Sequence, residues 1–510
     1  MWKLAIIIVL VLALLLFFFY WHAPEKDSKQ KLTSPSEPHV LLIVADSLML
    51  EPLVTLMNEG ELPAFTFLRE HGFMSELTST FPTMSVVNDS SILTGTYPDE
   101  HGIPGLVWFK TDENRFVDYG DAMGNIARRG PLNVAKDGIF NLNDNHLSSD
   151  VETIHETLAK QNISTASINL MVRRGDYRHY LRFPFNRIIG DTAISGPREL
   201  RHGYFLKGRE RRLPLPWNKY GYGNQQVEKM TLDIMGQPNT PRLVITYLSE
   251  PDKIIHKQGP TTTEPLYEVD RFIQNILDTF PSWEEALTNW RIAVLGDSGQ
   301  APVLSNEQQA LIAIPDLLSP YVLRGLGESP SDAEIAVATN ERMTYLYPLK
   351  PLNLEQLAGQ IVSDSRVDLV AYLNDDEKVH VHTASGSLQF NKGGTHSDVY
   401  GQNWEVDGDP ILLDVRQKSG EQWEYGGYKD VFRQLYAAVH AQPSAVVVTA
   451  HSGYEFQYEN SPTHVGGGSH GGISQQEMTV PLIVGGTTLR PKHDRLVDMK
   501  QYLIDCLELR

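Results

Sequence analysis

Three residues have the types and spacing of a metal site. Asp252 and His256, in EPDKIIHKQGP, are four residues apart, so on a helical turn they share one face and can bind one ion. His470 lies in the glycine-rich stretch GGGSHGGIS, where the backbone can approach a bound group closely. Together they offer three ligands and leave a fourth position open, as catalytic zinc sites do. An Asp/His pair at this spacing also occurs as a plain pair on a helix surface.

A second set carries oxygen ligands and a hydroxyl group. Asp46 and Asp297 each follow an apolar run and could hold a second ion, although an aspartate there can also be a helix N-cap. Ser85 begins a run that reads as a short helix, whose N-terminus favours an anion. A hydroxyl bound to a cation loses its proton easily and becomes a nucleophile. Two such cations could clamp the attacking and leaving oxygens of a phosphoryl transfer.

The elements that carry these residues alternate between strand and helix. Buried strands are predicted at 40–45, 243–248, 292–295, 445–448 and 480–484, and helices at 52–73, 151–161, 264–280, 429–441 and 497–508. This alternation predicts an α/β fold with a mostly parallel sheet and helices on both faces. Ligands bind at the carboxyl ends of strands in such sheets, where most of the candidate residues lie.

The domain organisation follows from shifts in composition. Residues 39–510 are expected to form the catalytic domain, with cap insertions at about 106–240 and 300–450. Within the second insertion, residues 338–373 read as strand–helix–strand and predict a small α/β lobe.

The N-terminus carries an apolar run of membrane-spanning length. Residues 4–21, LAIIIVLVLALLLFFFYW, predict a transmembrane signal anchor, and residues 22–38 read as a polar linker. We expect residues 1–3 in the cytoplasm and a single-pass protein of the cell membrane with its catalytic domain on the extracytoplasmic side. A cleaved signal peptide is the competing interpretation, but no A-x-A-like cleavage site follows the run.

Composition excludes several classes of protein. The 510 residues include 44 Lys and Arg against 63 Asp and Glu, a formal net charge of −19. Binding to a nucleic-acid duplex is not expected, because phosphate contacts need a basic surface. Cys506 is the single cysteine, so neither an internal disulfide nor a cysteine-based zinc or iron–sulfur site can form.

Four segments resemble the type I phosphodiesterase/nucleotide pyrophosphatase group of the alkaline phosphatase superfamily. They are FPTMSVVNDSSILTGTYPDEHGI, EPDKIIHKQGP, LGDSGQ and SHGGISQQEMTVPLIVGG. The resemblance implies an alkaline phosphatase-like fold, two divalent metal ions and Ser85 as nucleophile, with a phospho-enzyme intermediate. It implies zinc at Asp252, His256 and His470, and zinc or manganese at Asp46, Ser85 and Asp297.

The sequence departs from the family pattern at two positions. Relatives usually follow the late aspartate with a histidine that binds the second metal, where this chain has Ser298. Nucleotide-cleaving relatives have an asparagine oxyanion donor where this chain has Leu106. His451 could supply a missing group from another strand end, and Thr83 is a rival nucleophile two residues before Ser85.

These features predict a membrane-anchored, metal-dependent hydrolase of small-molecule phosphate esters, a phosphodiesterase or phosphatase. Two alternatives stay open. A degenerate member could bind one metal or a phosphorylated ligand with little turnover. An envelope phosphoglycol or phosphoethanolamine transferase would need more membrane-spanning segments than the single N-terminal run.

Overall fold

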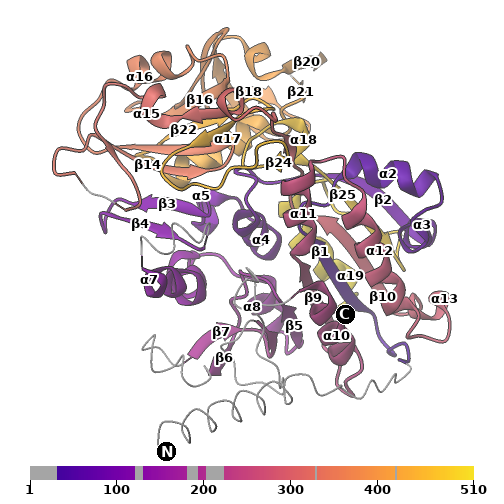
Figure 1. The fold of residues 1–510 in the computed structure, drawn as a ribbon. Coiled ribbons are helices and arrows are strands. Elements are labelled where there is room, and N and C mark those ends of the chain that lie inside the picture. The colour runs from indigo at the N-terminus through magenta and orange to yellow at the C-terminus, as the bar shows by residue number, and fades with distance from the viewer. Residues whose placement is uncertain are drawn as a thin grey trace, which may run out of the picture.

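The computed structural model describes residues 32–120, 130–180, 193–202, 223–327, 330–419 and 422–509 (Figure 1). The predicted transmembrane segment 4–21 and linker residues 22–31 lie outside this part of the chain. Among the described residues, no helix has both the length and the apolar character to cross a membrane. Residues 32–38 of the predicted linker contact the core: Leu32 is buried and its amide donates to the Thr279 carbonyl at 2.9 Å.

A seven-stranded central sheet carries the candidate site, in the order β2-β25-β10-β1-β9-β5-β8. Strand β1 is parallel to β9 and β10, and β5 is parallel to β8 and β9, whereas β25 is antiparallel to β2 and β10. The predicted mostly parallel sheet is therefore confirmed. Its strands are β1 (His39–Ala45), β2 (Gly72–Thr78), β5 (Thr165–Ile168), β8 (Glu199–Arg201), β9 (Leu243–Leu248), β10 (Trp290–Gly296) and β25 (Thr479–Gly485).

Helices cover both faces of this sheet because successive side chains of β1 point in opposite directions. Val40, Leu42 and Val44 pack with α4 (Ser85–Thr94), α8 (Ile154–Ala159) and α19 (Met499–Cys506). Leu41 and Ile43 pack with α2 (Leu50–Asn58), α3 (Pro63–Glu70), α10 (Asn224–Met235) and α12 (Glu264–Leu277).

The predicted single helix at 52–73 is wrong, because the chain forms two helices and then a strand. Helix α2 ends at Asn58, and Gly60 has a φ of +80°. Pro63 is the first residue of α3, where its missing amide hydrogen costs no helical hydrogen bond. Residues from Gly72 onward belong to β2.

A second, ten-stranded sheet lies beside the first and is mostly antiparallel (Figure 1). Its order is β13-β14-β15-β22-β16-β17-β18-β21-β20, with β19 paired to β18. Helix α17 (Val431–Ala441) packs in its core. The strands are β13 (Leu323–Arg324), β14 (Ile335–Asn340), β15 (Met343–Pro348), β16 (Val367–Leu373), β17 (Val379–Thr383), β18 (Gly386–Ser397), β19 (Asn403–Asp407), β20 (Val415–Ser419), β21 (Gln422–Tyr425) and β22 (Val446–Ala450).

This second sheet corrects two expectations. The run at 445–448 forms β22, which pairs with β15 and β16 and not with the central sheet. The stretch 338–373 does contain strands and a helix, α16 (Leu354–Ile361), but they belong to the ten-stranded sheet and not to a small separate lobe. An apolar β-rich run does not reveal which sheet it joins, since both sheets bury such strands.

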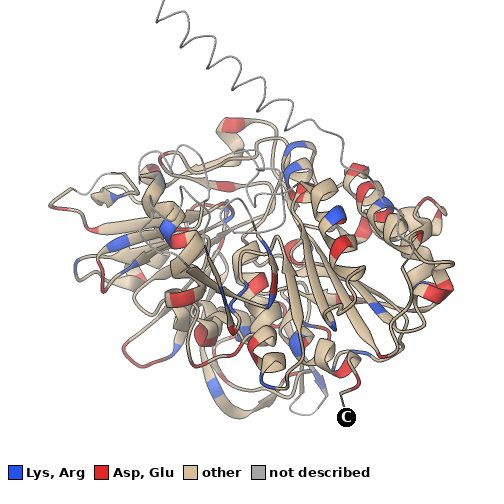
Figure 2. Ribbon diagram, turned by 90° about the horizontal axis from the view of Figure 1, so that it is seen from below, with Lys and Arg blue, Asp and Glu red and all other residues tan. Residues whose placement is uncertain are grey.

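Charged residues are scattered over the molecule. In the view of Figure 2, Lys and Arg segments of the described residues lie among Asp and Glu segments.

Candidate active site

The predicted metal ligands Asp252, His256 and His470 lie together at the edge of the central sheet. Helix α11 (Glu250–Gln258) begins just after β9 and carries the first two on one face. An Asp252 carboxylate oxygen (Oδ1) is 3.0 Å from His256 Nε2 and 3.4 Å from His470 Nε2. One ligand atom of each residue lies within 4.8 Å of the others, which is close enough for a single ion to contact all three.

The two imidazole rings present the correct nitrogen to this point. His256 Nδ1 bonds the Gly468 carbonyl at 2.8 Å, and His470 Nδ1 bonds the Thr83 carbonyl at 2.6 Å. Because Nδ1 then carries the proton, Nε2 of each ring is left as a ligand atom facing Asp252. Such backbone partners orient metal-binding histidines in many proteins.

The electrostatics of the group favour a positive charge. Burial alone would lower the pKa of His470, but Glu341 and Asp252 raise it to about 9. Burial would raise the pKa of Asp252, yet His256 and His470 hold it well below its usual range. A carboxylate and two free imidazole nitrogens in this potential fit a divalent cation such as zinc.

The second predicted set occupies neighbouring positions at the same edge. Asp46 follows β1 and Asp297 follows β10, and Ala45 is paired with Gly296 in the parallel register, so the two aspartates stand side by side. Ser85 is the first residue of α4, and its hydroxyl donates to an Asp46 oxygen at 3.2 Å. The structure therefore brings Asp46, Ser85 and Asp297 to the same sheet edge as the histidine site.

Asp297 is already held by donors of the protein. One oxygen, Oδ1, accepts from the backbone amides of Ser47 at 3.0 Å and Ser298 at 2.9 Å. The other, Oδ2, accepts from the Tyr247 hydroxyl at 3.3 Å. Burial raises the pKa of Asp297 despite these amides. Ser298 is fully buried, and its hydroxyl has no hydrogen-bond partner within the described part of the chain.

Two residues that sequence analysis missed connect the sets. The Ser47 hydroxyl donates to Asp252 at 3.1 Å, and the Gln300 amide donates to Asp252 at 2.8 Å and to the Ser47 hydroxyl at 3.1 Å. Gln300 stands in the LGDSGQ segment and Ser47 directly follows Asp46. Their positions beside predicted ligands could have marked them as members of the site.

His470 reaches the site although its strand runs the other way. Because β25 is antiparallel to β10, the loop before β25 lies at the edge where the parallel strands end. Arg342 fixes this loop: its amide donates to the His470 carbonyl at 3.1 Å, and its guanidinium pairs with buried Glu477 at 3.0 Å. Gly471 has a φ of +101°, and a side chain there would lie 2.4 Å from the Asn340 carbonyl.

The two rival residues have other contacts. The Thr83 hydroxyl is buried, donates to the Gly472 carbonyl at 3.0 Å and accepts from the Gly471 amide at 2.8 Å, so it secures the His470 loop. His451 is exposed at the end of β22, where its Nδ1 lies 3.3 Å from Asp368. It is not among the residues that line the cavity at the site.

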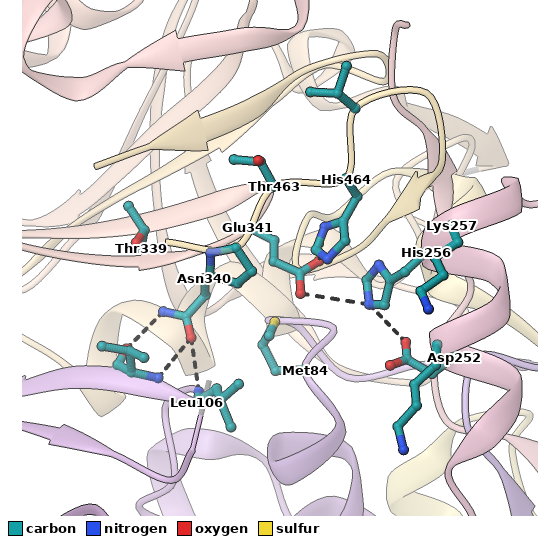
Figure 3. Close-up of a pocket in the computed structure, with 14 residues that line it drawn as sticks. Met84, Leu106, Asp252, His256, Lys257, Thr339, Asn340, Glu341, Thr463 and His464 are labelled. Atoms are coloured by element: carbon teal, nitrogen blue, oxygen red, sulfur yellow. Dashed lines mark hydrogen bonds and ion pairs between the residues drawn. The ribbon is translucent and has the colours of Figure 1, made fainter. Parts of the chain in front are cut away.

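A cavity of about 610 Å³ opens onto the ligand group (Figure 3). Leu106 lines it with an apolar side chain. Asn340 also lines it, but its amide oxygen accepts from the Leu106 and Val107 amides and its amide nitrogen donates to the Val107 carbonyl. The Asn340 amide therefore positions this backbone segment.

Glu341 and His464 also face this cavity, and sequence analysis missed both (Figure 3). Burial would raise the pKa of Glu341, but His470, His256 and His464 lower it to about 2. Glu341 comes from the second sheet, far along the chain from α11, so no local spacing marks it as part of the site.

Comparison with known proteins identifies the family. The sequence model of the type I phosphodiesterase / nucleotide pyrophosphatase family matches residues 40–472. The chain belongs to this family. The match includes Asp46, Ser85, Asp252, His256, Asp297 and His470 within its limits, and it confirms the resemblance carried by the four sequence segments. No curated protein sequence matches the chain.

Solved structures of the phosphodiesterase family share the fold. Murine ectonucleotide pyrophosphatase/phosphodiesterase 5, an inactive variant in complex with AMP, has a TM-score of 0.57 at 14% identity, covering 93% of this chain and 96% of its own. The human protein of the same name has a TM-score of 0.54 at 13% identity, covering 92% and 95%. At these identities the likeness establishes the mixed α/β fold alone.

Proposed function

We propose that this phosphodiesterase-family protein is a metal-dependent hydrolase of phosphate esters, acting on diesters, with Ser85 as its nucleophile. The observation that carries the proposal is the place of the Ser85 hydroxyl. It stands at the first residue of α4, bonds Asp46 at 3.2 Å and shares the sheet edge with Asp252, His256 and His470.

The chain's own residues account for the steps of the reaction. The N-terminus of α4 favours the anionic phosphate, and Asp46 orients the Ser85 hydroxyl toward it. The Ser85 hydroxyl passes its proton to Asp46 as its oxygen forms a bond to phosphorus and the bond to the leaving alkoxide breaks, and the alkoxide takes up one proton as the alcohol. Water then hydrolyses the phosphoserine ester and regenerates the hydroxyl. Divalent cations at the two ligand sets would supply positive charge that offsets charge on the phosphate oxygens.

An assay with nitrophenyl phosphate monoesters and diesters tests this function directly. Diesters that release AMP belong in the same screen, because the murine neighbour binds AMP. We expect diester turnover that EDTA abolishes and added zinc or manganese restores. A protein that carries metal but turns over none of these esters would favour the degenerate alternative, which the Ser298 and Leu106 departures already suggest.

Replacing Ser298 by histidine is expected to strengthen the second metal position. Serine is a poor ligand compared with imidazole, which leaves Asp46, Asp297 and Ser85 as an oxygen set suited to harder ions such as manganese. The wild type should therefore hold one zinc tightly and respond to added manganese, whereas Ser298→His should show higher activity in zinc alone. Metal content and rate are the measurements. Two tightly held zincs in the wild type would contradict this expectation.

We further propose that residues 4–21 anchor the protein in the cell membrane, with the catalytic domain on the extracytoplasmic side. Their apolar run is long enough to span a bilayer. Deleting residues 1–31 should release a soluble, folded protein, because the contacts of the described core begin at Leu32. Fractionation and protease accessibility check this. Full-length protein found free in the medium and trimmed near residue 24 would instead indicate a cleaved signal peptide.

A further inference from the structure

Two lysines line the cavity without an acidic partner. Lys253 and Lys257, both on α11, are among the side chains that form its wall. Within the described part of the chain, neither ammonium group forms an ion pair or a hydrogen bond. Glu250, the acidic residue three positions before Lys253, is engaged elsewhere, since its carboxylate accepts from the Asn224 amide at 3.1 Å. The cavity therefore holds two positive charges that no described carboxylate pairs with.

The helical spacing places these lysines beside the predicted metal ligands. Lys253 directly follows Asp252, and Lys257 directly follows His256. One residue corresponds to about 100° of rotation about a helix axis, so the two pairs form neighbouring rows along α11. In Figure 3, Lys257 and His256 stand next to each other at the cavity wall. A phosphate held at the ligand row would have the lysine row next to it.

The fold itself gives little reason for two lysines at these positions. Two like charges four residues apart on a helix repel each other. Lys253 is the fourth residue of α11, in the first turn, where the helix dipole disfavours a cation. The two carboxylates that line the cavity have other partners: Asp252 lies 3.0 Å from His256, and Glu341 accepts from the Ser469 hydroxyl at 2.9 Å. An anion bound between the lysines would offset their repulsion.

Another part of the cavity wall is apolar. Met84, Leu106 and Val107 contribute to it, and in Figure 3 Leu106 lies on the far side of the cavity from Lys257. The volume of about 610 Å³ is in the range of pockets that hold small organic ligands, so there is room for more than one phosphate group. The cavity thus suits a ligand with an apolar body and an anionic group directed toward α11.

We propose that Lys253 and Lys257 bind a second anionic group of the substrate, so that the protein selects phosphate esters that carry a further phosphate or carboxylate over esters with neutral substituents. The inference rests on the proposed function, because it places the reacting phosphate at the neighbouring ligand row. Electrostatic complementarity of this kind discriminates between ligands of similar size and shape.

Binding of ligands without turnover tests the inference apart from catalysis. The full chain with Ser85→Ala, loaded with zinc, is titrated by calorimetry with phenyl phosphate, 3-carboxyphenyl phosphate and 1,3-phenylene bisphosphate. We expect the ligands with a second anionic group to bind about 10-fold more tightly than phenyl phosphate at low salt, and the difference to shrink as salt screens the charges. The larger of the two gains identifies the preferred anion. Equal affinity for all three ligands would overturn the proposal.

Substitutions on α11 assign the effect to the lysines. Replacing both Lys253 and Lys257 by methionine should bring the three affinities to within about 2-fold of each other, whereas replacing both by arginine should keep the difference. As a matched control, Lys160→Met with Lys418→Met removes the same charge from exposed positions outside the cavity and should leave the difference unchanged. A difference that persists in the double methionine variant on α11 would overturn the proposal.

Turnover of matched diesters connects the preference to the proposed function. Nitrophenyl phenyl phosphate and its 3-carboxyphenyl analogue release the same nitrophenolate, so a difference in kcat/KM reports the second group. We expect the carboxylated diester to be favoured by about 10-fold in the wild type and not in the double methionine variant on α11. Equal kcat/KM for the two diesters would overturn the proposal as a basis of substrate choice. No turnover of either diester, with the binding difference intact, would count against the proposed hydrolysis while still supporting the lysine site.

Discussion

Replacing Ser85 by alanine is expected to lower kcat/KM for a phosphodiester by at least about 1,000-fold, because it removes the attacking oxygen. The fold should survive, since the variant loses one partly buried hydrogen bond to Asp46, worth about 1 kcal/mol. Metal content at Asp252, His256 and His470 should also be retained, because the Ser85 hydroxyl bonds Asp46 and not these three residues. Steady-state kinetics, a thermal melt and zinc analysis check these expectations together.

A matched control lies on the same helix. The Ser90 hydroxyl bonds the Val86 carbonyl within α4 at 2.7 Å, so Ser90→Ala removes a buried hydroxyl without touching the site. We expect Ser90→Ala to keep activity. Full activity in Ser85→Ala together with loss of activity in Thr83→Ala would assign the nucleophile to Thr83, despite the contacts that engage its hydroxyl in the His470 loop.

Removing His470 is expected to have the largest effect on metal binding. His470→Ala leaves only Asp252 and His256 of the three predicted ligands, so zinc affinity should fall by at least about 100-fold and activity should fall with it. If zinc binds only the folded chain, as we expect, the wild type should gain about 2.7 kcal/mol of stability at a zinc concentration 100 times its dissociation constant. In His470→Ala this gain should disappear.

Zinc titration of the thermal melt measures both effects. His451→Ala is the control, because it also removes a histidine but one paired with Asp368 outside the cavity. An equal loss of zinc stabilisation in both variants would mean that the change at His470 acts through general destabilisation. Zinc stabilisation that persists in His470→Ala would place the ion elsewhere.

Local patterns predicted the parts of the site that local geometry builds. The four-residue spacing of Asp252 and His256 places both on one face of α11, and Ser85 does begin a helix. The strand–helix alternation predicted the central sheet because buried parallel strands read as continuous apolar runs. No local sequence pattern predicts which residues from distant parts of the chain lie beside His256. Glu341 and His464 are separated from α11 by long stretches of sequence: Glu341 reaches His256 from the turn between β14 and β15, and His464 from the loop between β23 (Glu455–Gln457) and β24 (Gly468–Ser469).

The turn between β14 and β15 belongs to the second sheet but contacts both the cavity and the segment that leads into β25 of the central sheet. Its two residues point to different partners: Glu341 enters the cavity, and Arg342 pairs with Glu477 and donates to the carbonyls of residues 450, 451 and 454. Removing the Arg342 side chain alone would leave Glu477 as a buried, uncompensated charge, a change that costs about 3–5 kcal/mol. The second sheet is thus not a detachable module, and recombination between relatives at its borders would have to exchange the 470–478 loop along with it.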